Sequence, residues 1–343
     1  MATVLSGMRP TGRLHLGNYT GALASWLQNQ TQHRCYFMVA DWHALTTDLD
    51  TAAIAQRTRD MVIDWLAVGL DPERAPIFVQ SQVPEHAELH LVFSMLVTLS
   101  RLERNPTVKE QVRDLGLDDN VSYGHLGYPV LQAADILLYK ADLVPVGEDQ
   151  APHVEITREI ARRFDKTFGD VFPVPRVELT RFGRFPGLDG QRMSKSVGNT
   201  IELAAPPDEI RQKMRRAAID PARVRADDPG HPEACTVFVY HQRFSPPEVL
   251  PVVESECRAG ARVRSCLDCK MEVADRIAAH FAPARERRQA LEADTSRVDA
   301  VLEAGNEAAG RVAAATMREV RAALGLGGRS GVRPPAAEGR SGR

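Results

Sequence analysis

A short segment near the amino terminus has residue types that can bind a phosphate. It runs from Gly7 to Asn18 and ends in His15, Leu16, Gly17 and Asn18. His15 and Asn18 are three residues apart, so at the start of a helix both side chains can face one ligand. Exposed backbone amides at a helix start favour an anion, and a glycine there lets the ligand approach the backbone closely. Taken alone, the pattern fits a capped helix after a loop at least as well.

A second polar segment carries two cations and two hydroxyl groups. It reads Arg192-Met193-Ser194-Lys195-Ser196, and glycine-containing turns at 187–190 and 197–199 flank it. Such a loop can close over a polyphosphate and stabilise the charge that develops on a leaving pyrophosphate. Taken alone, it fits a solvated basic loop equally well.

Together, the two segments resemble the paired signature motifs of class I aminoacyl-tRNA synthetases. The first motif, His-x-Gly-His in that class, reads His15-Leu16-Gly17-Asn18 here, and the second, Lys-Met-Ser-Lys-Ser, reads Arg192 to Ser196. Their order and separation are similar to those of the small enzymes for tyrosine and tryptophan. Asn18 replaces the second histidine, as tryptophan enzymes commonly do. Arg192 replaces the first lysine, which keeps the charge but changes the geometry of contact.

The middle of the chain resembles the tryptophanyl-tRNA synthetases. The matching stretch runs from Tyr128 to Tyr139 and continues from Val144 to Gln150. In that family the aspartate at the position of Asp135 accepts a hydrogen bond from the indole N–H of tryptophan. A carboxylate accepts and an indole only donates, so an apolar amino acid would leave the carboxylate unpaired. The apolar neighbours of Asp135 argue against an ordinary surface carboxylate.

The resemblance implies further site residues, position by position. The catalytic set would be His15, Asn18, Arg192 and Lys195. The ATP site would be lined by Arg9, Pro10, Thr11, Gly17, Asn18, Gly147, Glu148, Asp149, Phe185, Arg192, Met193, Ser194, Lys195 and Ser196. Tryptophan would be bordered by Asp135, Tyr128, Gln150 and His43. His43 could equally be a satisfied histidine at the end of a strand.

The resemblance also implies a reaction and its partners. ATP would activate L-tryptophan to tryptophanyl-adenylate with release of pyrophosphate, and the amino acid would then pass to tRNA(Trp). Lys195, Arg192, backbone amides and Mg²⁺ would position the reactants and stabilise phosphate charge, with no protein nucleophile. A homodimer is expected by analogy. The alternatives are the tyrosine enzyme, a synthetase-like regulator without activity, and a nucleotidyltransferase that makes a dinucleotide cofactor.

Four of the five cysteines fall within a short stretch of the second half of the chain. They are Cys235, Cys257, Cys266 and Cys269. In a reducing compartment such a cluster is more often a metal site than a pair of disulfides, and four thiolates suit either tetrahedral zinc or a [4Fe–4S] cluster. A subset of tryptophanyl-tRNA synthetases is similar here and holds a [4Fe–4S] cluster, which we therefore expect ahead of zinc. Cys35 stands in an apolar run and reads as a buried strand residue.

The elements that must position these residues alternate between strand and helix. Apolar runs predict strands at 3–6, 35–40, 75–80 and 143–146. Helical periodicity predicts helices at 18–30, 51–69, 84–101 and 130–139, and another that starts near residue 150. This alternation predicts an α/β fold with a parallel sheet covered on both faces, whose ligands bind beyond the carboxyl ends of the strands.

The chain changes character after residue 200. We expect a Rossmann-like catalytic domain at 1–200 and a helical anticodon-binding domain at 201–326 that carries the four cysteines. A helical run covers 296–324, although Gly305 and Gly310 argue against one unbroken helix. The glycine-, proline- and arginine-rich end, 327–343, is expected to be disordered.

Composition and charge set broader limits. The 343 residues are 43% hydrophobic and 26% charged, which is ordinary for a globular protein. No stretch approaches eighteen consecutive apolar residues and no secretory signal is visible, so we expect a cytoplasmic protein. The net charge of −2 does not by itself indicate a nucleic-acid partner. A local basic face could, and Arg258, Arg262, Arg264 and Lys270 beside the cysteines are candidates for it.

Overall fold

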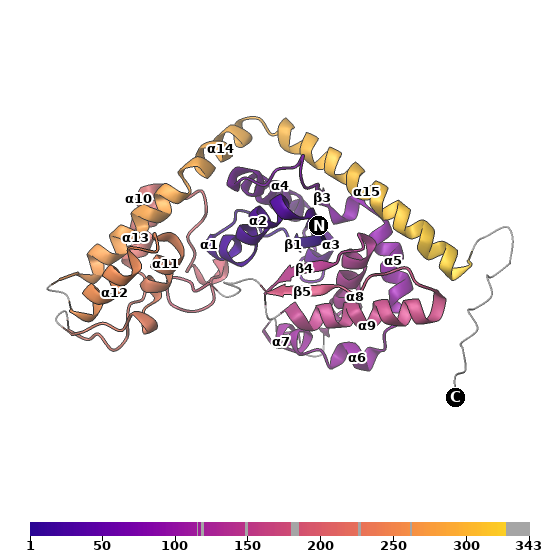
Figure 1. The fold of residues 1–343 in the computed structure, drawn as a ribbon, viewed down its shortest axis with the longest axis horizontal. Coiled ribbons are helices and arrows are strands. Elements are labelled where there is room, and N and C mark those ends of the chain that lie inside the picture. The colour runs from indigo at the N-terminus through magenta and orange to yellow at the C-terminus, as the bar shows by residue number, and fades with distance from the viewer. Residues whose placement is uncertain are drawn as a thin grey trace.

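The computed structural model describes residues 1–114, 116–117, 120–147, 150–179, 185–225, 228–260 and 263–326. Figure 1 shows a central sheet with helices around it, a group of helices to one side, and two helices that run from that group back across the sheet region. The tail at 327–343, for which we predict disorder, lies outside the described residues.

The sheet has five parallel strands in the order β3-β2-β1-β4-β5. Their bounds are β1 Thr3–Met8, β2 Arg34–Val39, β3 Ile77–Val79, β4 Leu143–Val146 and β5 Arg176–Leu179. The four predicted strands are confirmed, and β5 is an additional strand. The central strand β1 pairs with β2 on one side and β4 on the other, with Val4 facing both Cys35 and Leu143. The chain order reverses between β1 and β4, so the loop after β1 leaves the sheet at its switch point, where ligands of such folds bind.

The helical segments predicted in the first two hundred residues are found, with two corrections. The bounds of the helices are α1 Leu16–Asn18, η1 Tyr19–Leu23, α2 Ala24–Gln32, α3 Asp41–Ala44, α4 Thr51–Val68, η2 Gln80–Gln82, α5 Glu85–Ser94, α6 Leu99–Glu103, α7 Pro106–Asp114, α8 Tyr123–Leu138, α9 Ala151–Phe168 and η5 Lys195–Val197. Of these, α3, α7, η2 and η5 are additional. The single helix predicted at 84–101 is wrong: α5 ends at Ser94 and α6 begins after Thr98, whose backbone is extended. Apolar residues continue through the break, so periodicity does not reveal it. The helix predicted from residue 130 begins earlier, where the Ser122 hydroxyl accepts the His125 N–H.

Helices dominate the rest of the described chain, as predicted. Their bounds are α10 Pro207–Arg215, η6 Pro232–Ala234, α11 Thr236–Phe244, α12 Leu250–Arg258, α13 Cys266–His280, α14 Ala282–Ala293 and α15 Ser296–Leu324. In Figure 1, α10 to α13 form a group beside the sheet, whereas α14 lies over α4, and α15 passes β3 and α5. The division of the chain into domains at residue 200 stays a prediction.

Helix α15 is one unbroken helix with the predicted bounds, and its glycines do not interrupt it. Gly305 is buried against β3, where an added Cβ would lie 1.8 Å from the carbonyl oxygen of Ile77. The next residue, Asn306, accepts a hydrogen bond of 2.9 Å from the backbone N–H of Val79. Gly305 therefore allows the helix to lie directly on the backbone of the strand.

A buried ion pair ties α14 to the region of the first loop. Arg288 and Asp64 are 2% and 2% exposed, and the guanidinium of Arg288 bonds to the carboxylate of Asp64. The other carboxylate oxygen accepts the Leu14 N–H at 2.6 Å. Burial raises the pKa of Asp64 to about 6, although Arg288 and the Leu14 N–H oppose the rise. Removal of one partner from such a pair is costly because the other charge stays buried.

The two glycines of α15 form a matched pair for a stability test. Gly305→Ala is expected to lower the free energy of unfolding by about 1 to 3 kcal/mol, since the methyl group meets the backbone of β3. Gly310 has open space around it, so Gly310→Ala is expected to raise the free energy of unfolding by roughly 0.5 to 1 kcal/mol through helix propensity. Urea denaturation followed by circular dichroism measures both. Equal effects of the two alanines would contradict the packing of α15 on β3.

Candidate active site

Backbone hydrogen bonds fix the first motif at the carboxyl end of β1. Leu16 N–H donates to the carbonyl of Ile201, and Leu203 N–H donates to the carbonyl of Leu14, each at 2.9 Å. The side chains of Leu14 and Leu16 are fully buried. His15 lies between these two anchors at the start of α1. The backbone on both sides of His15 is therefore held in place.

The two polar motifs meet, as the shared-ligand interpretation requires. The ammonium of Lys195 donates to the carbonyl oxygen of Thr11 at 2.6 Å, and the Gly17 N–H points to the sulfur of Met193 at 3.2 Å. A Cβ on Gly17 would lie 3.0 Å from the imidazole of His15 and 3.3 Å from Met193. Gly17 of the first motif thus packs directly against Met193 of the second, and a larger residue at position 17 would push the two motifs apart.

The polar groups of this region have defined donor roles. Burial and the charge of Lys195 lower the pKa of His15 to about 4, so its imidazole is neutral near pH 7. Desolvation also lowers the pKa of Lys195, and the carboxylates of Glu202 and Asp64 oppose this. The amide oxygen of Asn18 accepts the His15 N–H at 3.0 Å, which leaves its NH₂ group to face a ligand. The arrangement offers neutral and cationic donors to a polyphosphate.

Asn199, which is not among the predicted site residues, organises the second motif. Its amide oxygen accepts the Ser194 N–H at 2.7 Å. Its NH₂ group donates to the Asp189 carboxylate at 2.8 Å and to the Arg192 carbonyl at 3.0 Å. Asn199 is 5% exposed, and an added Cβ at Gly187 would lie 2.3 Å from its side chain. The sequence signal for this role is an asparagine in the glycine-containing turn that directly follows the motif.

Asp135 lies at the centre of a buried hydrogen-bond network. It is 2% exposed on α8, and its Oδ2 lies 2.8 Å from His43 Nε2. Its Oδ1 lies 2.6 Å from His86 Nδ1 and accepts from the amide of Gln80 at 2.7 Å. Burial favours a raised pKa, but the hydrogen bonds from His43 and His86 outweigh it and lower the pKa of Asp135 to about 2. The carboxylate is therefore ionised and can accept a further hydrogen bond.

Of the other residues predicted to border tryptophan, His43 contacts this carboxylate and Tyr128 packs toward His43. The ring centroids of Tyr128 and His43 are 6.3 Å apart. The hydroxyl of Tyr128 lies 2.7 Å from Nε2 of His153 on α9, the helix that Gln150 begins. His86, Gln80 and His153 were not predicted, because they come from separate helices and no local spacing connects them to Asp135 or Tyr128.

The remaining predicted ATP residues differ in their surroundings. Burial lowers the pKa of Arg9, the nearby Tyr128 opposes the shift and the positive charge of Arg192 adds to it. Gly147 follows β4, and its carbonyl accepts the Gln150 N–H at 3.0 Å. Phe185 is buried against the rings of Tyr240 and Phe244 on α11. Pro10 is buried, while Ser196 is exposed and lies 2.9 Å from Ser194 through their hydroxyls. Glu148 and Asp149 lie outside the described residues.

The four clustered cysteines surround one small cavity of about 20 Å³. Cys235 precedes α11, Cys257 lies on α12, and Cys266 and Cys269 lie on the first turn of α13. Arg223 donates to the sulfur of Cys266 at 3.2 Å. Within the described residues, no three His, Cys, Asp or Glu side chains are arranged to hold a single metal ion. The four thiols thus share one cavity without converging on one point.

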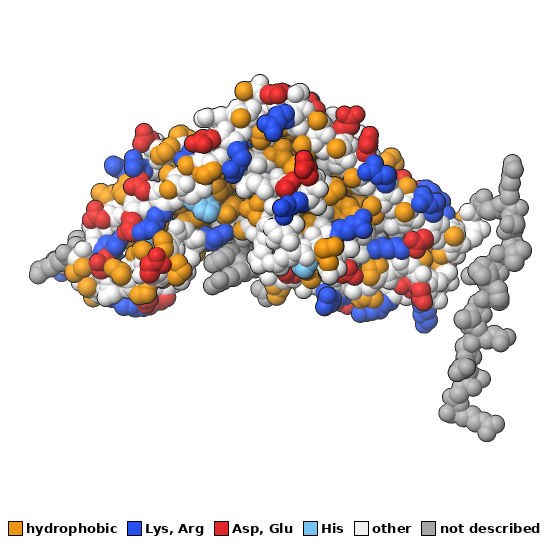
Figure 2. Space-filling view, turned by 45° about the horizontal axis from the view of Figure 1, so that its top comes forward, with side chains coloured by type: hydrophobic (Ala, Val, Ile, Leu, Met, Phe, Trp, Pro, Cys, Tyr) orange, Lys and Arg blue, Asp and Glu red, His pale blue; other side chains and the backbone are white. Residues whose placement is uncertain are grey.

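The basic residues beside the cysteines are largely paired with carboxylates. Arg264 bonds to Glu256 and Glu272, and Arg258 bonds to Glu233 and Glu254. Figure 2 shows acidic and basic side chains interspersed over the face that it presents. The basic surface that we expected here is therefore mostly neutralised by its own neighbours. Arg262 lies outside the described residues.

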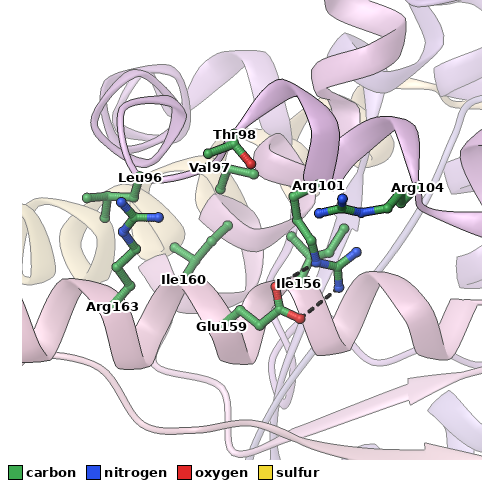
Figure 3. Close-up of a pocket in the computed structure, with 9 residues that line it drawn as sticks. All are labelled: Leu96, Val97, Thr98, Arg101, Arg104, Ile156, Glu159, Ile160 and Arg163. Atoms are coloured by element: carbon green, nitrogen blue, oxygen red, sulfur yellow. Dashed lines mark hydrogen bonds and ion pairs between the residues drawn. The ribbon is translucent and has the colours of Figure 1, made fainter.

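A larger cavity, of about 240 Å³, lies between α6 and α9 and away from the site described above. Figure 3 shows its floor of Ile156 and Ile160, with Arg101 paired to Glu159 on one side. Both nitrogen contacts of Arg101 to this carboxylate are short, at 2.8 and 2.7 Å. None of the predicted site residues lines this cavity, so it is not where the motifs would act.

Comparison with known proteins agrees with the geometry. Residues 1–282 match the model of the family described as tRNA synthetases class I (W and Y). A tryptophan–tRNA ligase of Thermotoga maritima is 49% identical over 94% of this chain and 99% of its own length, and one of Deinococcus radiodurans is 44% identical over 95% and 99%. The crystal structure of tryptophanyl-tRNA synthetase from Campylobacter jejuni, complexed with ADP and tryptophan, superposes with a TM-score of 0.82 at 29% identity and covers 94% of this chain and 100% of its own. The chain belongs to the class I tRNA synthetases and, within them, to the tryptophan–tRNA ligase family.

The neutral state of His15 gives a test by ATP–pyrophosphate exchange. His15→Ala is expected to lower kcat by roughly 10²- to 10³-fold, as for the loss of a donor to transition-state charge. His15→Gln keeps an uncharged donor and should retain more activity. Because the pKa of His15 is held at about 4, the ratio of wild-type to His15→Gln activity should stay constant from about pH 6 to pH 8. A tenfold change of that ratio near pH 6.5 would show that the charged imidazole is used.

Proposed function

We propose that this chain is a tryptophan–tRNA ligase that activates L-tryptophan with ATP and transfers it to tRNA(Trp). The observation that carries the proposal is the contact of the two motifs at the carboxyl end of β1, where Lys195 reaches Thr11 and Gly17 meets Met193. The buried, ionised Asp135 provides the second half of the site. Membership of the tryptophan–tRNA ligase family supports the choice of amino acid.

In the first step, a carboxylate oxygen of tryptophan attacks the α-phosphorus of ATP. A new oxygen–phosphorus bond forms as the bond to the bridging oxygen breaks, and pyrophosphate leaves with that electron pair. Lys195 and Arg192 stabilise the charge on pyrophosphate, with His15 and the Asn18 amide as neutral donors. Mg²⁺ bound to ATP would supply further positive charge at the phosphates. In the second step, a ribose hydroxyl at the 3′ end of the tRNA attacks the acyl carbon and releases AMP.

The remaining roles follow the predicted sets. The ATP site is proposed to include Arg9, Pro10, Thr11, Gly17, Gly147, Glu148, Asp149, Phe185, Met193, Ser194 and Ser196. Asp135, His43, Tyr128 and Gln150 are proposed to border the amino acid. The proximity of the Asp135, His43 and Tyr128 side chains supports this grouping.

The activation step is tested by amino-acid-dependent exchange of labelled pyrophosphate into ATP. We expect exchange with tryptophan and not with tyrosine. Asp135→Ala removes the acceptor for the indole N–H, and we expect it to lower kcat/KM for tryptophan by about 10²-fold or more. Exchange that is equal with tyrosine, or that survives unchanged in Asp135→Ala, would argue against this assignment of the pocket.

We propose that Cys235, Cys257, Cys266 and Cys269 hold a [4Fe–4S] cluster, with zinc as the alternative. The donor set fits either centre, since both take four thiolates. The cysteines line one cavity together with Arg223, whose guanidinium donates to the sulfur of Cys266. A zinc ion requires all four sulfurs at about 2.3 Å from one point, whereas a cluster holds them farther apart. The resemblance of the four-cysteine pattern to the iron–sulfur subset is what supports the cluster ahead of zinc. When bound, such a centre would cross-link α11, α12 and α13.

Metal analysis of anaerobically purified protein separates the two centres. We expect about four irons and four sulfides per chain, and a Cys269→Ser variant that has lost most of its iron and unfolds at a lower temperature. Cys35→Ala is the control, because Cys35 is buried in β2, away from the cavity. One zinc per chain in place of iron would favour zinc as the bound metal. Protein that contains neither iron nor zinc would contradict the proposed metal site.

We propose further that the chain works as a homodimer in the cytoplasm, with a catalytic domain at 1–200 and an anticodon-binding domain at 201–326. Three exposed large apolar side chains, on α5, at its carboxyl end and at the start of α6, support a subunit contact. Leu91, Met95 and Leu99 are 59%, 73% and 60% exposed. Apolar side chains that gather on a surface in this way are typical of protein contacts. Within the described residues, no helix is long and apolar enough to cross a membrane.

A further inference from the structure

A histidine outside the predicted site is connected directly to the carboxylate that selects the substrate. His86 lies on the first turn of α5 and is 0% exposed. Its Nδ1 lies 2.6 Å from Oδ1 of Asp135, and its Nε2 lies 2.9 Å from the hydroxyl of Tyr139. Both ring nitrogens are therefore used, one toward the carboxylate and one toward a buried phenol.

The chemistry of the partners sets the direction of these hydrogen bonds. Burial, followed by the charge of Asp135, raises the pKa of Tyr139 well above its ordinary value, so its hydroxyl keeps its proton. That hydroxyl can then donate to Nε2 of His86. An ionised carboxylate only accepts, so Nδ1 carries the hydrogen and donates to Asp135. Hydrogen-bond donation thus runs from Tyr139 to His86 and from His86 to Asp135.

Aromatic packing prevents the His86 ring from turning. Its centroid lies 6.0 Å from the ring of Phe78 and 5.5 Å from that of Tyr139. Tyr139 in turn packs against Tyr36 at 5.0 Å. A ring held on several sides, with both nitrogens bonded, gives the carboxylate a fixed partner rather than a mobile one.

The two oxygens of Asp135 have unequal surroundings. Oδ1 accepts from both His86 and Gln80, which fills its two acceptor positions. Oδ2 has His43 as its hydrogen-bond partner, and His43 is 8% exposed and packs toward Tyr128. Oδ2 therefore keeps a free acceptor position on the side of the proposed amino-acid site.

We propose that His86, held by Tyr139, is a positioning residue that fixes the Asp135 carboxylate so that Oδ2 faces the indole N–H of tryptophan. This inference rests on the proposed function. His86 touches neither ATP nor tryptophan in this role. It acts by preventing rotation of the Asp135 carboxylate. Oδ2 then accepts a hydrogen bond from one direction only, and a bound amino acid must place its donor there.

The test compares tryptophan with an analogue whose indole N–H is replaced by sulfur, 3-(3-benzothienyl)alanine. Isothermal titration calorimetry gives the dissociation constant of each ligand. The dissociation constant of the analogue divided by that of tryptophan measures how strongly the protein selects for the N–H. His86→Leu is expected to lower this ratio by about tenfold to a hundredfold, because a hydrogen bond to a charged group becomes misaligned. His86→Asn keeps a donor near the position of Nδ1 and should restore most of the ratio.

Further variants keep the outcomes distinct. Tyr139→Phe removes only the hydroxyl behind His86 and should lower the ratio by a few fold, which provides a measurement if His86→Leu does not fold. His33→Asn, a histidine outside this network, is the control and should leave the ratio unchanged. Equal weakening of both ligands in His86→Leu, with an unchanged ratio, would reduce His86 to a structural role and overturn the inference. A wild-type protein that binds no tryptophan would instead overturn the proposed function.

Discussion

The catalytic region depends on the pairing of the backbone at residues 14–16 with the backbone at residues 201–203. The Leu16 N–H to Ile201 and the Leu203 N–H to Leu14 hydrogen bonds hold together two segments that are remote in sequence. Main-chain pairing of this kind does not depend on side-chain rotamers. It places the start of α1 within reach of the second motif, so that Gly17 and Lys195 can make their contacts across the gap. Without it, the two motifs would be present in the chain but would not lie in one place.

The two ends of the proposed site, one toward phosphate and one toward the amino acid, have opposite electrostatic requirements, and a different physical effect meets each. At the phosphate end, desolvation keeps His15 neutral, so the cationic charge is concentrated on Lys195 and Arg192. At the amino-acid end, desolvation would neutralise Asp135, but hydrogen bonds from two histidines keep it ionised. Burial therefore decides the protonation state at one end, and hydrogen bonding decides it at the other.

Much of this arrangement could be predicted from the sequence, because its signals are local. The four strands, the long helix α15 and the two motifs each depend on residues close together in the chain, and the order of strand and helix predicts the parallel sheet. The network around Asp135 could be predicted only in part: His43 is grouped with Asp135, whereas Gln80 and His86 come from other elements and no local spacing connects them to it. Gly305 shows the same limit. Helix propensity counts it as a weakness, whereas its real role is set by the backbone of β3, which no local pattern reveals.

The packing of α15 on β3 has a consequence for solubility. β3 is an edge strand of the sheet, and an open edge invites other chains to add strands to it. Asn306 takes the Val79 N–H, and the backbone at Gly305 lies against Ile77, so the helix covers that edge where another strand would pair. A chain shortened before residue 296 would keep both motifs and all four clustered cysteines. It would also present an uncovered parallel edge, and self-association through that edge would compete with its folding.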